Sequence, residues 1–182
     1  MLDTTPQFAA ATQVWQDQLS HGDVVLYRFP SADEDASGAK IRPCLILDIE
    51  KIAGQRYAVL AYGTTATTRS NTGLEVRVSS AAARAAAGLD EATRFVGARR
   101  ILVPLESAGF DLRSEMNSPV IGRLAGSAYE RMDRVRARLH AERDIAADRR
   151  QQKRRRWLTR SDFVVEHRRP RSLSSAPTAS SK

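Results

Sequence analysis

The chain has 182 residues, enough for one domain with short extensions, and its 42% apolar content is sufficient for a modest core. A single cysteine, Cys44, excludes an intramolecular disulfide framework and lies in an apolar run typical of a buried strand. The N-terminus lacks a basic segment followed by an apolar run, and no apolar stretch of about 18 residues occurs. We therefore expect a cytoplasmic protein without a membrane partner.

The formal net charge of +8 is concentrated at the C-terminal end of the chain. Residues 149–182 hold 11 Lys and Arg against 2 acidic residues, whereas residues 1–148 hold 18 basic and 19 acidic side chains. The main part of the chain is therefore close to neutral. High overall basicity does not by itself indicate a nucleic-acid-binding domain.

The first third of the chain predicts a short helix followed by three strands. Residues 5–20 carry apolar side chains at helical spacing behind a Thr-Pro start. Apolar runs bounded by turn residues predict strands over about 23–29, 42–49 and 57–65. A turn at Ala53-Gly54 would join the second and third strands into a hairpin.

The rest of the chain predicts shorter β segments and a long helix. Alternation predicts a fourth strand over 74–78, with Glu75 and Arg77 on the face opposite its apolar residues. An alanine-rich helix over 80–87 stops at Gly88, and short β segments follow near 93–96 and 101–104. A capping box, Ser127 to Glu130, opens a helix with a core stripe of Ala128, Met132, Val135 and Leu139.

These elements predict a mainly β protein with α: a small, strongly bent antiparallel sheet or barrel closed by a C-terminal helix. We divide the chain into an N-terminal helical extension (1–20), a barrel domain (21–148) and a basic, partly disordered tail (149–182). No glycine-rich phosphate loop opens a helix, and no Cys, His or carboxylate group has metal-ligand spacing. We therefore expect neither a nucleotide cofactor nor a metal.

If the hairpin forms, it should bring one arginine close to one threonine hydroxyl at its open end. Pairing around Ala53-Gly54 sets Arg42 opposite Thr64 or Thr65, and directly opposed Cβ atoms lie roughly 4.5–5.5 Å apart. A guanidinium beside a hydroxyl supplies the donors and the positive charge needed to hold a phosphate. The alternative reading of the same pair is a solvated strand end.

Five short motifs follow one another along the chain: Gly22-Asp23-Val24-Val25, Lys40-Ile41-Arg42-Pro43, Thr64-Thr65, Leu74-Glu75-Val76 and Gly122-Arg123-Leu124. Their order and their surroundings resemble the PemK/MazF family of bacterial toxins, over about residues 21–142. The resemblance implies an SH3-like barrel, a homodimer, and an acidic antitoxin as partner. It also implies metal-independent cleavage of single-stranded RNA by attack of the ribose 2′-OH, the activity of an mRNA interferase in a type II toxin–antitoxin system.

The resemblance assigns the catalytic pair to Arg42 and Thr64. Arg42 would bind the scissile phosphate and offset charge in the transition state, while Thr64 would hydrogen-bond a phosphoryl oxygen, with Thr65 as its substitute. His21, just before the first strand, would support the mouth of the site. The acidic residue or histidine that several family members carry in the first long loop is absent, since residues 37–40 read Ser-Gly-Ala-Lys. The general base is therefore unassigned.

Basic side chains near the predicted site would bind the RNA backbone, and these are Lys40, Arg99 and Arg100. The cluster from Arg149 to Arg160 combines arginines with Trp157, a mixture suited to nucleic-acid backbones and bases. Two alternatives to the nuclease stay open. One is a non-catalytic barrel that binds a protein target, as in a group of gyrase-poisoning toxins, and the other is a decayed relative that regulates by binding nucleic acid.

Overall fold

The computed structural model describes residues 15–30, 40–114 and 116–160, with the backbone alone for 158–160. Contacts divide the chain into two units, one up to Arg143 and one from Asp144 onward. Of the helix predicted over 5–20, residues 5–14 lie outside the described residues, while residues 15–18 form a helical turn. In the described ranges, no helix combines the length and the apolarity needed to cross a bilayer.

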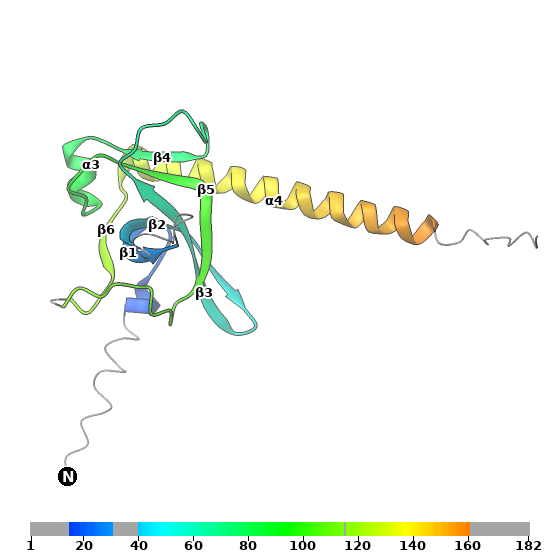
Figure 1. The fold of residues 1–182 in the computed structure, drawn as a ribbon, viewed down its shortest axis with the longest axis horizontal. Helices are drawn as coiled ribbons and strands as arrows, with labels where there is room; N and C mark the ends of the chain where they lie inside the picture. The colour runs from blue at the N-terminus through cyan, green and yellow to red at the C-terminus, as the bar shows by residue number, and fades with distance from the viewer. Residues whose placement is uncertain (1–14, 31–39, 115, 161–182) are drawn as a thin grey trace, which may run out of the picture. The chain divides into compact units, whose positions relative to one another are not determined.

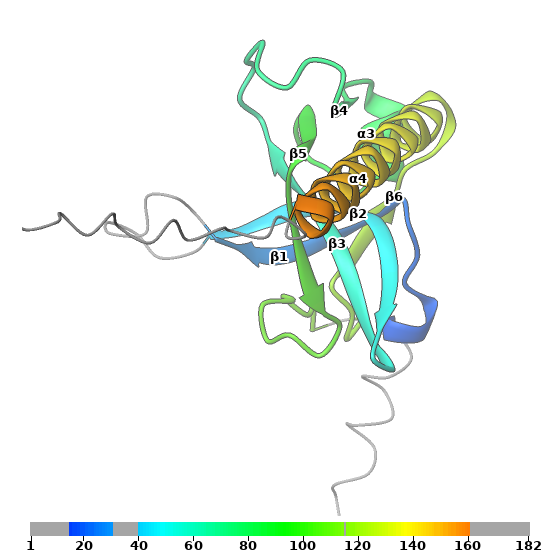
Figure 2. The same cartoon turned by 90° about the vertical axis from the view of Figure 1, so that its right-hand side faces the viewer.

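Six antiparallel strands form one sheet in the order β4-β5-β3-β2-β1-β6. The strands are β1 (Asp23–Phe29), β2 (Lys40–Ile52), β3 (Gln55–Thr64), β4 (Glu75–Val78), β5 (Thr93–Pro104) and β6 (Val120–Arg123). Within the described ranges, the sheet is accompanied by the helices α3 (Ala81–Ala86) and α4 (Gly126–Arg160). The sheet curls into a half-barrel (Figures 1 and 2). A mainly antiparallel β architecture with a C-terminal helix is thus confirmed.

The β2–β3 hairpin turns where the sequence predicts. Ala53 and Gly54 have φ of 49° and 89°, and two positive φ values at adjacent central residues are the signature of a type I′ turn. The paired residues run from Ile52↔Gln55 at the turn to Cys44↔Tyr62, with one register shift between Ile46 and Asp48. This tight turn fixes which residues meet at the open end of the hairpin.

Strand β5 differs from the two short segments that the sequence predicted. Ala61 of β3 pairs with Arg100 and Tyr62 pairs with Val96, so residues 97–99 bulge out of a single long strand. Gly97 sits at the start of this bulge, where an added Cβ would lie 2.9 Å from Val135 Cγ1. Close packing against α4 favours a glycine there.

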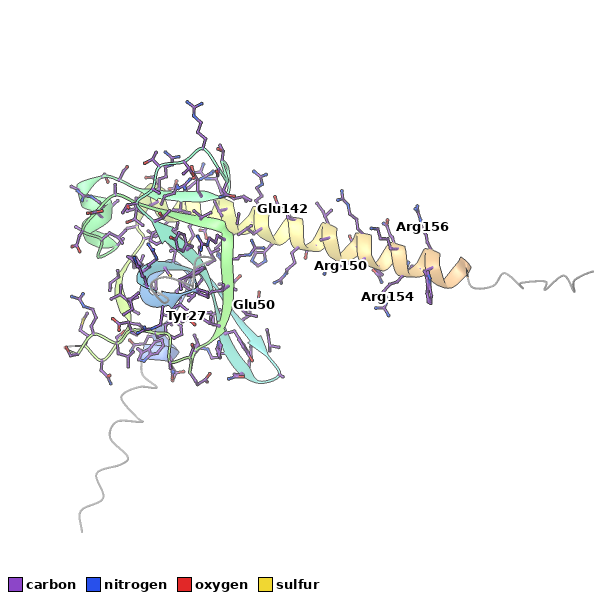
Figure 3. All side chains as sticks on the ribbon, viewed as in Figure 1. Tyr27, Glu50, Glu142, Arg150, Arg154 and Arg156 are labelled. Atoms are coloured by element: carbon purple, nitrogen blue, oxygen red, sulfur yellow. The ribbon has the colours of Figure 1, made fainter. Side chains whose placement is uncertain are left out.

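Two hydrophobic clusters cover the two faces of the sheet. The first includes Val24, Leu45 and Phe95 of the strands and the predicted α4 stripe of Ala128, Met132, Val135 and Leu139, all buried. The second lies on the opposite face, where Tyr27 (labelled in Figure 3) packs edge-on against Phe110, with ring centroids 5.0 Å apart. The Trp15 ring of the helical turn packs at a tilt against the same Phe110, with centroids 5.2 Å apart. The α4 stripe is therefore confirmed as a core element.

Strand β6 has no counterpart among the predicted strands. It pairs with β1 and so brings the end of the β region next to its start. Asp23 pairs with Arg123, and Arg123 Nε donates to Asp23 Oδ1 at 2.7 Å. The Asp23 carboxylate also accepts from the Ser20 backbone N–H at 2.8 Å. Gly22 has a φ of +91°, and a Cβ there would lie 2.8 Å from the Tyr129 ring. The Gly22-Asp23 motif therefore serves the fold.

Helix α3 packs against β6 through a close backbone contact. A Cβ on Gly122 would lie 2.3 Å from the carbonyl carbon of Ala87, and one on Gly88 would lie 1.9 Å from Ile121 O. The helix is capped by Ser80, whose Oγ accepts from the Ala83 N–H at 3.2 Å. Since α3 follows the edge strand β4 and contacts the other edge strand, it connects the two edges of the curled sheet.

Replacing Asp23 with alanine is expected to lower the free energy of unfolding by about 2 kcal/mol, because hydrogen bonds to charged groups contribute ~1.5–3 kcal/mol. The Asp23 side chain is only 6% exposed, so its two bonds are shielded from water. Urea denaturation measures the change. Asp17→Ala is the matched control: that carboxylate pairs with Arg56 but is 78% exposed, and its loss should change stability by less than about 0.5 kcal/mol. Equal effects of the two substitutions would contradict the structural role of Asp23.

Candidate functional site

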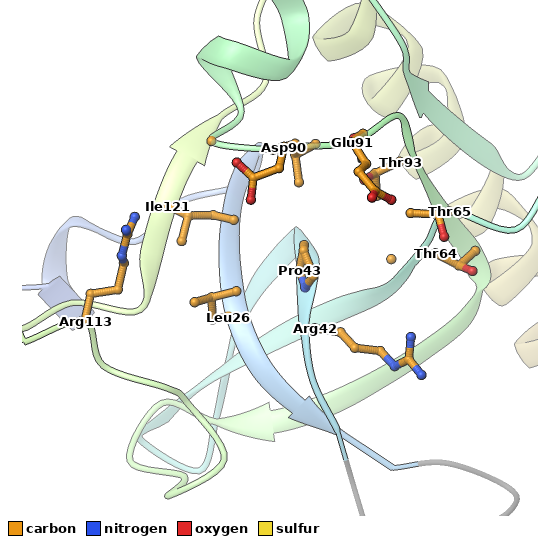
Figure 4. A pocket seen from close by; sticks show the side chains of 13 residues that line it. Leu26, Arg42, Pro43, Thr64, Thr65, Asp90, Glu91, Thr93, Arg113 and Ile121 are labelled. Carbon is orange, nitrogen blue, oxygen red and sulfur yellow. The ribbon is translucent and has the colours of Figure 1, made fainter.

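A cavity of about 450 Å³ opens where β2 begins and β3 ends, at the end of the hairpin opposite the turn. The segment between α3 and β5 closes one side of it and β6 another (Figure 4). The charged and hydroxyl side chains among its lining residues are Arg42, Thr64, Thr65, Asp90, Glu91, Thr93 and Arg113. Arg42, Thr64 and Thr65, which the sequence singled out, thus line one cavity together. The predicted direct pairing of Arg42 with Thr64 or Thr65 is wrong, because the β2–β3 ladder ends at the Cys44–Tyr62 pair.

Arg42 is half-buried on β2, and its backbone pairs with Tyr27 of β1. Its guanidinium carbon lies 5.4 Å from the centroid of the Tyr62 ring. Residues two apart on a strand share a face, so Arg42 lies on the face of Cys44, the pairing partner of Tyr62. The guanidinium is therefore held at the rim of the cavity by an aromatic neighbour rather than by a carboxylate.

Thr64 ends β3 and is half-buried, whereas Thr65 is exposed. Thr64 Oγ1 accepts a hydrogen bond from the Ala66 N–H at 3.1 Å, which shapes the chain as it leaves the strand. The hydroxyl proton of Thr64 stays available for an acceptor in the cavity, because this bond uses only the oxygen lone pair. The Thr64 hydroxyl can therefore still act as a donor.

A second cation joins Arg42 on the same aromatic surface. The Arg99 guanidinium carbon lies 4.0 Å from the Tyr62 centroid and 5.7 Å from that of Phe29. Phe29 meets Tyr62 edge-on at 5.2 Å. We call Phe29, Arg42, Tyr62 and Arg99 the aromatic–guanidinium cluster. Arg99 is exposed, so its guanidinium is accessible from solvent.

An ion pair anchors the loop that follows Thr65. Arg94 is the pairing partner of Thr64, and its Nη1 donates to Glu75 Oε2 at 2.8 Å in a setting where both side chains are 9% exposed. The same guanidinium donates to Thr68 O at 2.9 Å and to Thr68 Oγ1 at 2.8 Å. Glu75, on the face of β4 expected to be polar, is thus buried beneath the loop, and the pair stabilises the cavity wall.

The pKa of Glu75 reflects this anchoring. Burial raises the pKa of the carboxyl, but hydrogen bonds from Arg94 and Arg77 outweigh burial and leave it below the ordinary value of 4.5. Its carboxylate therefore stabilises the folded chain above about pH 4.5, and that contribution is lost as the pH falls through the lowered pKa.

Two acidic residues, Asp90 and Glu91, line the same cavity and were missed at the sequence level. Both are exposed and lie in the turn between Gly88 and the start of β5. In Figure 4 they lie above Pro43 while Arg42 lies below it. Asp90 and Glu91 follow Gly88, which ends the alanine-rich helix. This local signal predicts a turn, but it does not predict that the turn lies beside the ends of β2 and β3.

The other predicted site residues lie in different surroundings. Lys40 is exposed at the start of β2, opposite Phe29. Arg100 lines a separate cavity of about 270 Å³ beside α4, where His140 Nε2 lies 2.9 Å from Asp48 Oδ2. His21 packs against the Tyr129 ring, with centroids 5.9 Å apart, and does not line the Arg42 cavity.

Cys44 follows the lining residues Arg42 and Pro43 in the chain but does not suit nucleophilic chemistry. The thiol is fully buried, and burial raises its pKa to about 12, which keeps it protonated at neutral pH. Across residues 15–30, 40–114 and 116–160, no three His, Cys, Asp or Glu side chains cluster as metal ligands would. The groups that the described cavity offers are guanidinium, hydroxyl and carboxylate.

Neither protein-family models nor curated protein sequences gave a match to this chain. The functional argument therefore rests on the cavity itself.

Replacing Glu75 with glutamine is expected to lower stability at pH 7, because the buried Arg94 loses its carboxylate partner. The difference from wild type should shrink as the pH drops below about 4.5, since the wild-type carboxylate becomes protonated there. Urea denaturation at a series of pH values between 7 and 3 measures this. Glu106→Gln, which alters an exposed carboxylate bonded to Gln55, serves as control. A Glu75→Gln deficit that is constant with pH would refute the assignment.

Proposed function

We propose that this protein is an endoribonuclease that cleaves single-stranded RNA without a metal, as the toxin of a type II toxin–antitoxin pair of the PemK/MazF kind. The observation that carries the proposal is one cavity lined by Arg42, Thr64, Asp90 and Glu91. Guanidinium, hydroxyl donor and carboxylate are the groups required to bind a phosphodiester and to activate a hydroxyl beside it. The proposal includes an SH3-like barrel, a cytoplasmic homodimer and an acidic antitoxin that competes for the same cavity.

The proposed reaction is an intramolecular transesterification. A carboxylate of Asp90 or Glu91 accepts the proton of the ribose 2′-OH, and the 2′-oxygen forms a bond to the adjacent phosphorus. The bond from phosphorus to the 5′-oxygen breaks, and the departing oxygen takes a proton from solvent water. The products are a 2′,3′-cyclic phosphate and a 5′-hydroxyl end. DNA lacks the internal nucleophile and would not be cut.

Arg42 and Thr64 would act on the phosphoryl oxygens. A guanidinium presents several donors with permanent charge, so it binds the phosphate and stabilises the extra charge of the transition state. The Thr64 hydroxyl donates to a second oxygen while its own oxygen is held by the Ala66 N–H. Tyr62 is a positioning residue in this scheme, because its ring restricts where the Arg42 guanidinium can lie.

Arg42→Ala is expected to reduce cleavage of a defined single-stranded RNA by about 10²–10³-fold, the usual cost of removing a transition-state donor. The assay uses purified protein in excess chelator, with mapping of the product ends. Arg56→Ala is the matched control. Arg56 lies on β3 near the hairpin turn, where its backbone pairs with that of Lys51, at the opposite end of the strands from the cavity. The control should cleave at the wild-type rate.

Three outcomes of that assay would contradict the nuclease. They are cleavage by Arg42→Ala at the wild-type rate, cleavage at a 2′-deoxy position, and requirement for a divalent cation. A wild-type protein that leaves RNA intact yet inhibits growth would instead support the non-catalytic protein-binding alternative.

Asp90→Asn and Glu91→Gln test the general base separately. Removing the group that takes up the 2′-OH proton should lower kcat by about 10²–10⁴-fold with little change in KM, because these isosteric amides keep the cavity shape but cannot accept a proton. Substituting the acidic residue that is not the base should change kcat only slightly. Wild-type kcat in both variants would exclude this pair of carboxylates, and circular dichroism would verify that each variant is folded.

A further inference from the structure

The part of α4 that belongs to the second unit is strongly basic, and none of its described side chains belongs to either hydrophobic cluster. Residues 149–157 contain six Lys and Arg and no acidic side chain. All nine residues are exposed, and Trp157 retains 72% of its surface. An exposed tryptophan within a run of cations leaves a large apolar ring in water, which is energetically unfavourable unless the ring binds a partner.

Helical spacing gathers these side chains onto one face. Arg150, Arg154 and Trp157 are separated by four and three residues, so they form one row along the helix. Arg149 and Lys153 form the adjacent row, one residue earlier. We call these five residues the basic face. Figure 3 shows Arg150 and Arg154 projecting from the same side of α4.

The basic face repels itself. Arg149 and Lys153, like Arg150 and Arg154, are like-charged pairs at a spacing of four residues, which destabilises a helix. A polyanion along the face would remove the repulsion and release its own counterions at the same time.

We propose that the basic face of α4 binds single-stranded nucleic acid without sequence preference, with the four cations on phosphates and Trp157 stacked on an unpaired base. The tryptophan distinguishes this ligand from others of the same charge. A duplex keeps its bases stacked within the helix, and an acidic peptide offers no ring, whereas a single strand offers both phosphates and exposed π-faces. The proposal stands independently of the Arg42 cavity.

Titration of the full chain with oligodeoxythymidylate tests the proposal and cannot be confused with catalysis, because this ligand has no 2′-OH. The exposed Trp157 supplies the signal, since the other tryptophan, Trp15, is buried. We expect fluorescence quenching with an affinity that falls as salt rises. Each phosphate contact contributes about −0.7 to the slope of log K against log salt, so four contacts contribute roughly −3.

Two variants and a control make the test decisive. Replacing the four cations of the basic face with glutamine should weaken binding at least tenfold at low salt and reduce the slope by about 3. Trp157→Ala should weaken binding by about tenfold with the slope unchanged, a loss followed by filter binding. The control replaces four basic residues of the other unit, Lys51, Arg69, Arg134 and Arg138, with glutamine and so removes the same net charge.

Three results would overturn the proposal. The first is equal weakening by the control and by the basic-face variant. The second is an equal or higher affinity for duplex DNA of the same length, and the third is an equal affinity for polyglutamate. Since glutamine is a good helix former, circular dichroism of the basic-face variant should show unchanged helicity.

Discussion

Strands β2 and β3 approach each other so closely at the open end of their hairpin that a Cβ on Gly63 would lie 2.1 Å from Pro43 O. Only glycine fits there, because the contact is with backbone rather than with a side chain that could move. The neighbouring residues, Arg42 and Thr64, depend on this contact, since it lies where β2 and β3 separate beyond the Cys44–Tyr62 pair. The cavity lies beside it, so its cationic and hydroxyl groups are positioned by backbone packing.

Around this contact, the short sequence motifs divide into two roles. Gly22-Asp23 and Arg123 hold the ends of the sheet unit together through a buried carboxylate, and they do not line the cavity. Arg42 and the Thr64-Thr65 pair do line it. The aromatic ring of Tyr62 and the loop anchored by Glu75 and Arg94 orient these groups without contributing reactive atoms themselves. Structural and chemical demands are thus met by separate residues.

Local patterns were enough to predict the elements but not the full cavity. The type I′ turn at Ala53-Gly54 and the apolar stripe of α4 carry strong short-range signals, so the hairpin and the helix were correctly predicted. Strand β6 is short and only partly buried, and its pairing with β1 lies about a hundred residues away in sequence. Asp90 and the Arg99–Tyr62 contact depend on the same kind of long-range packing, which periodicity does not encode.

A crystal structure of the protein with an oligoribonucleotide that carries one 2′-deoxy position would test the central claim most directly. The account predicts a phosphate within hydrogen-bond distance of the Arg42 guanidinium and of the Thr64 hydroxyl. It also predicts that the blocked 2′ position of the preceding ribose faces Asp90 or Glu91. An oligonucleotide that leaves the cavity empty, or that presents only bases to Arg42, would contradict it.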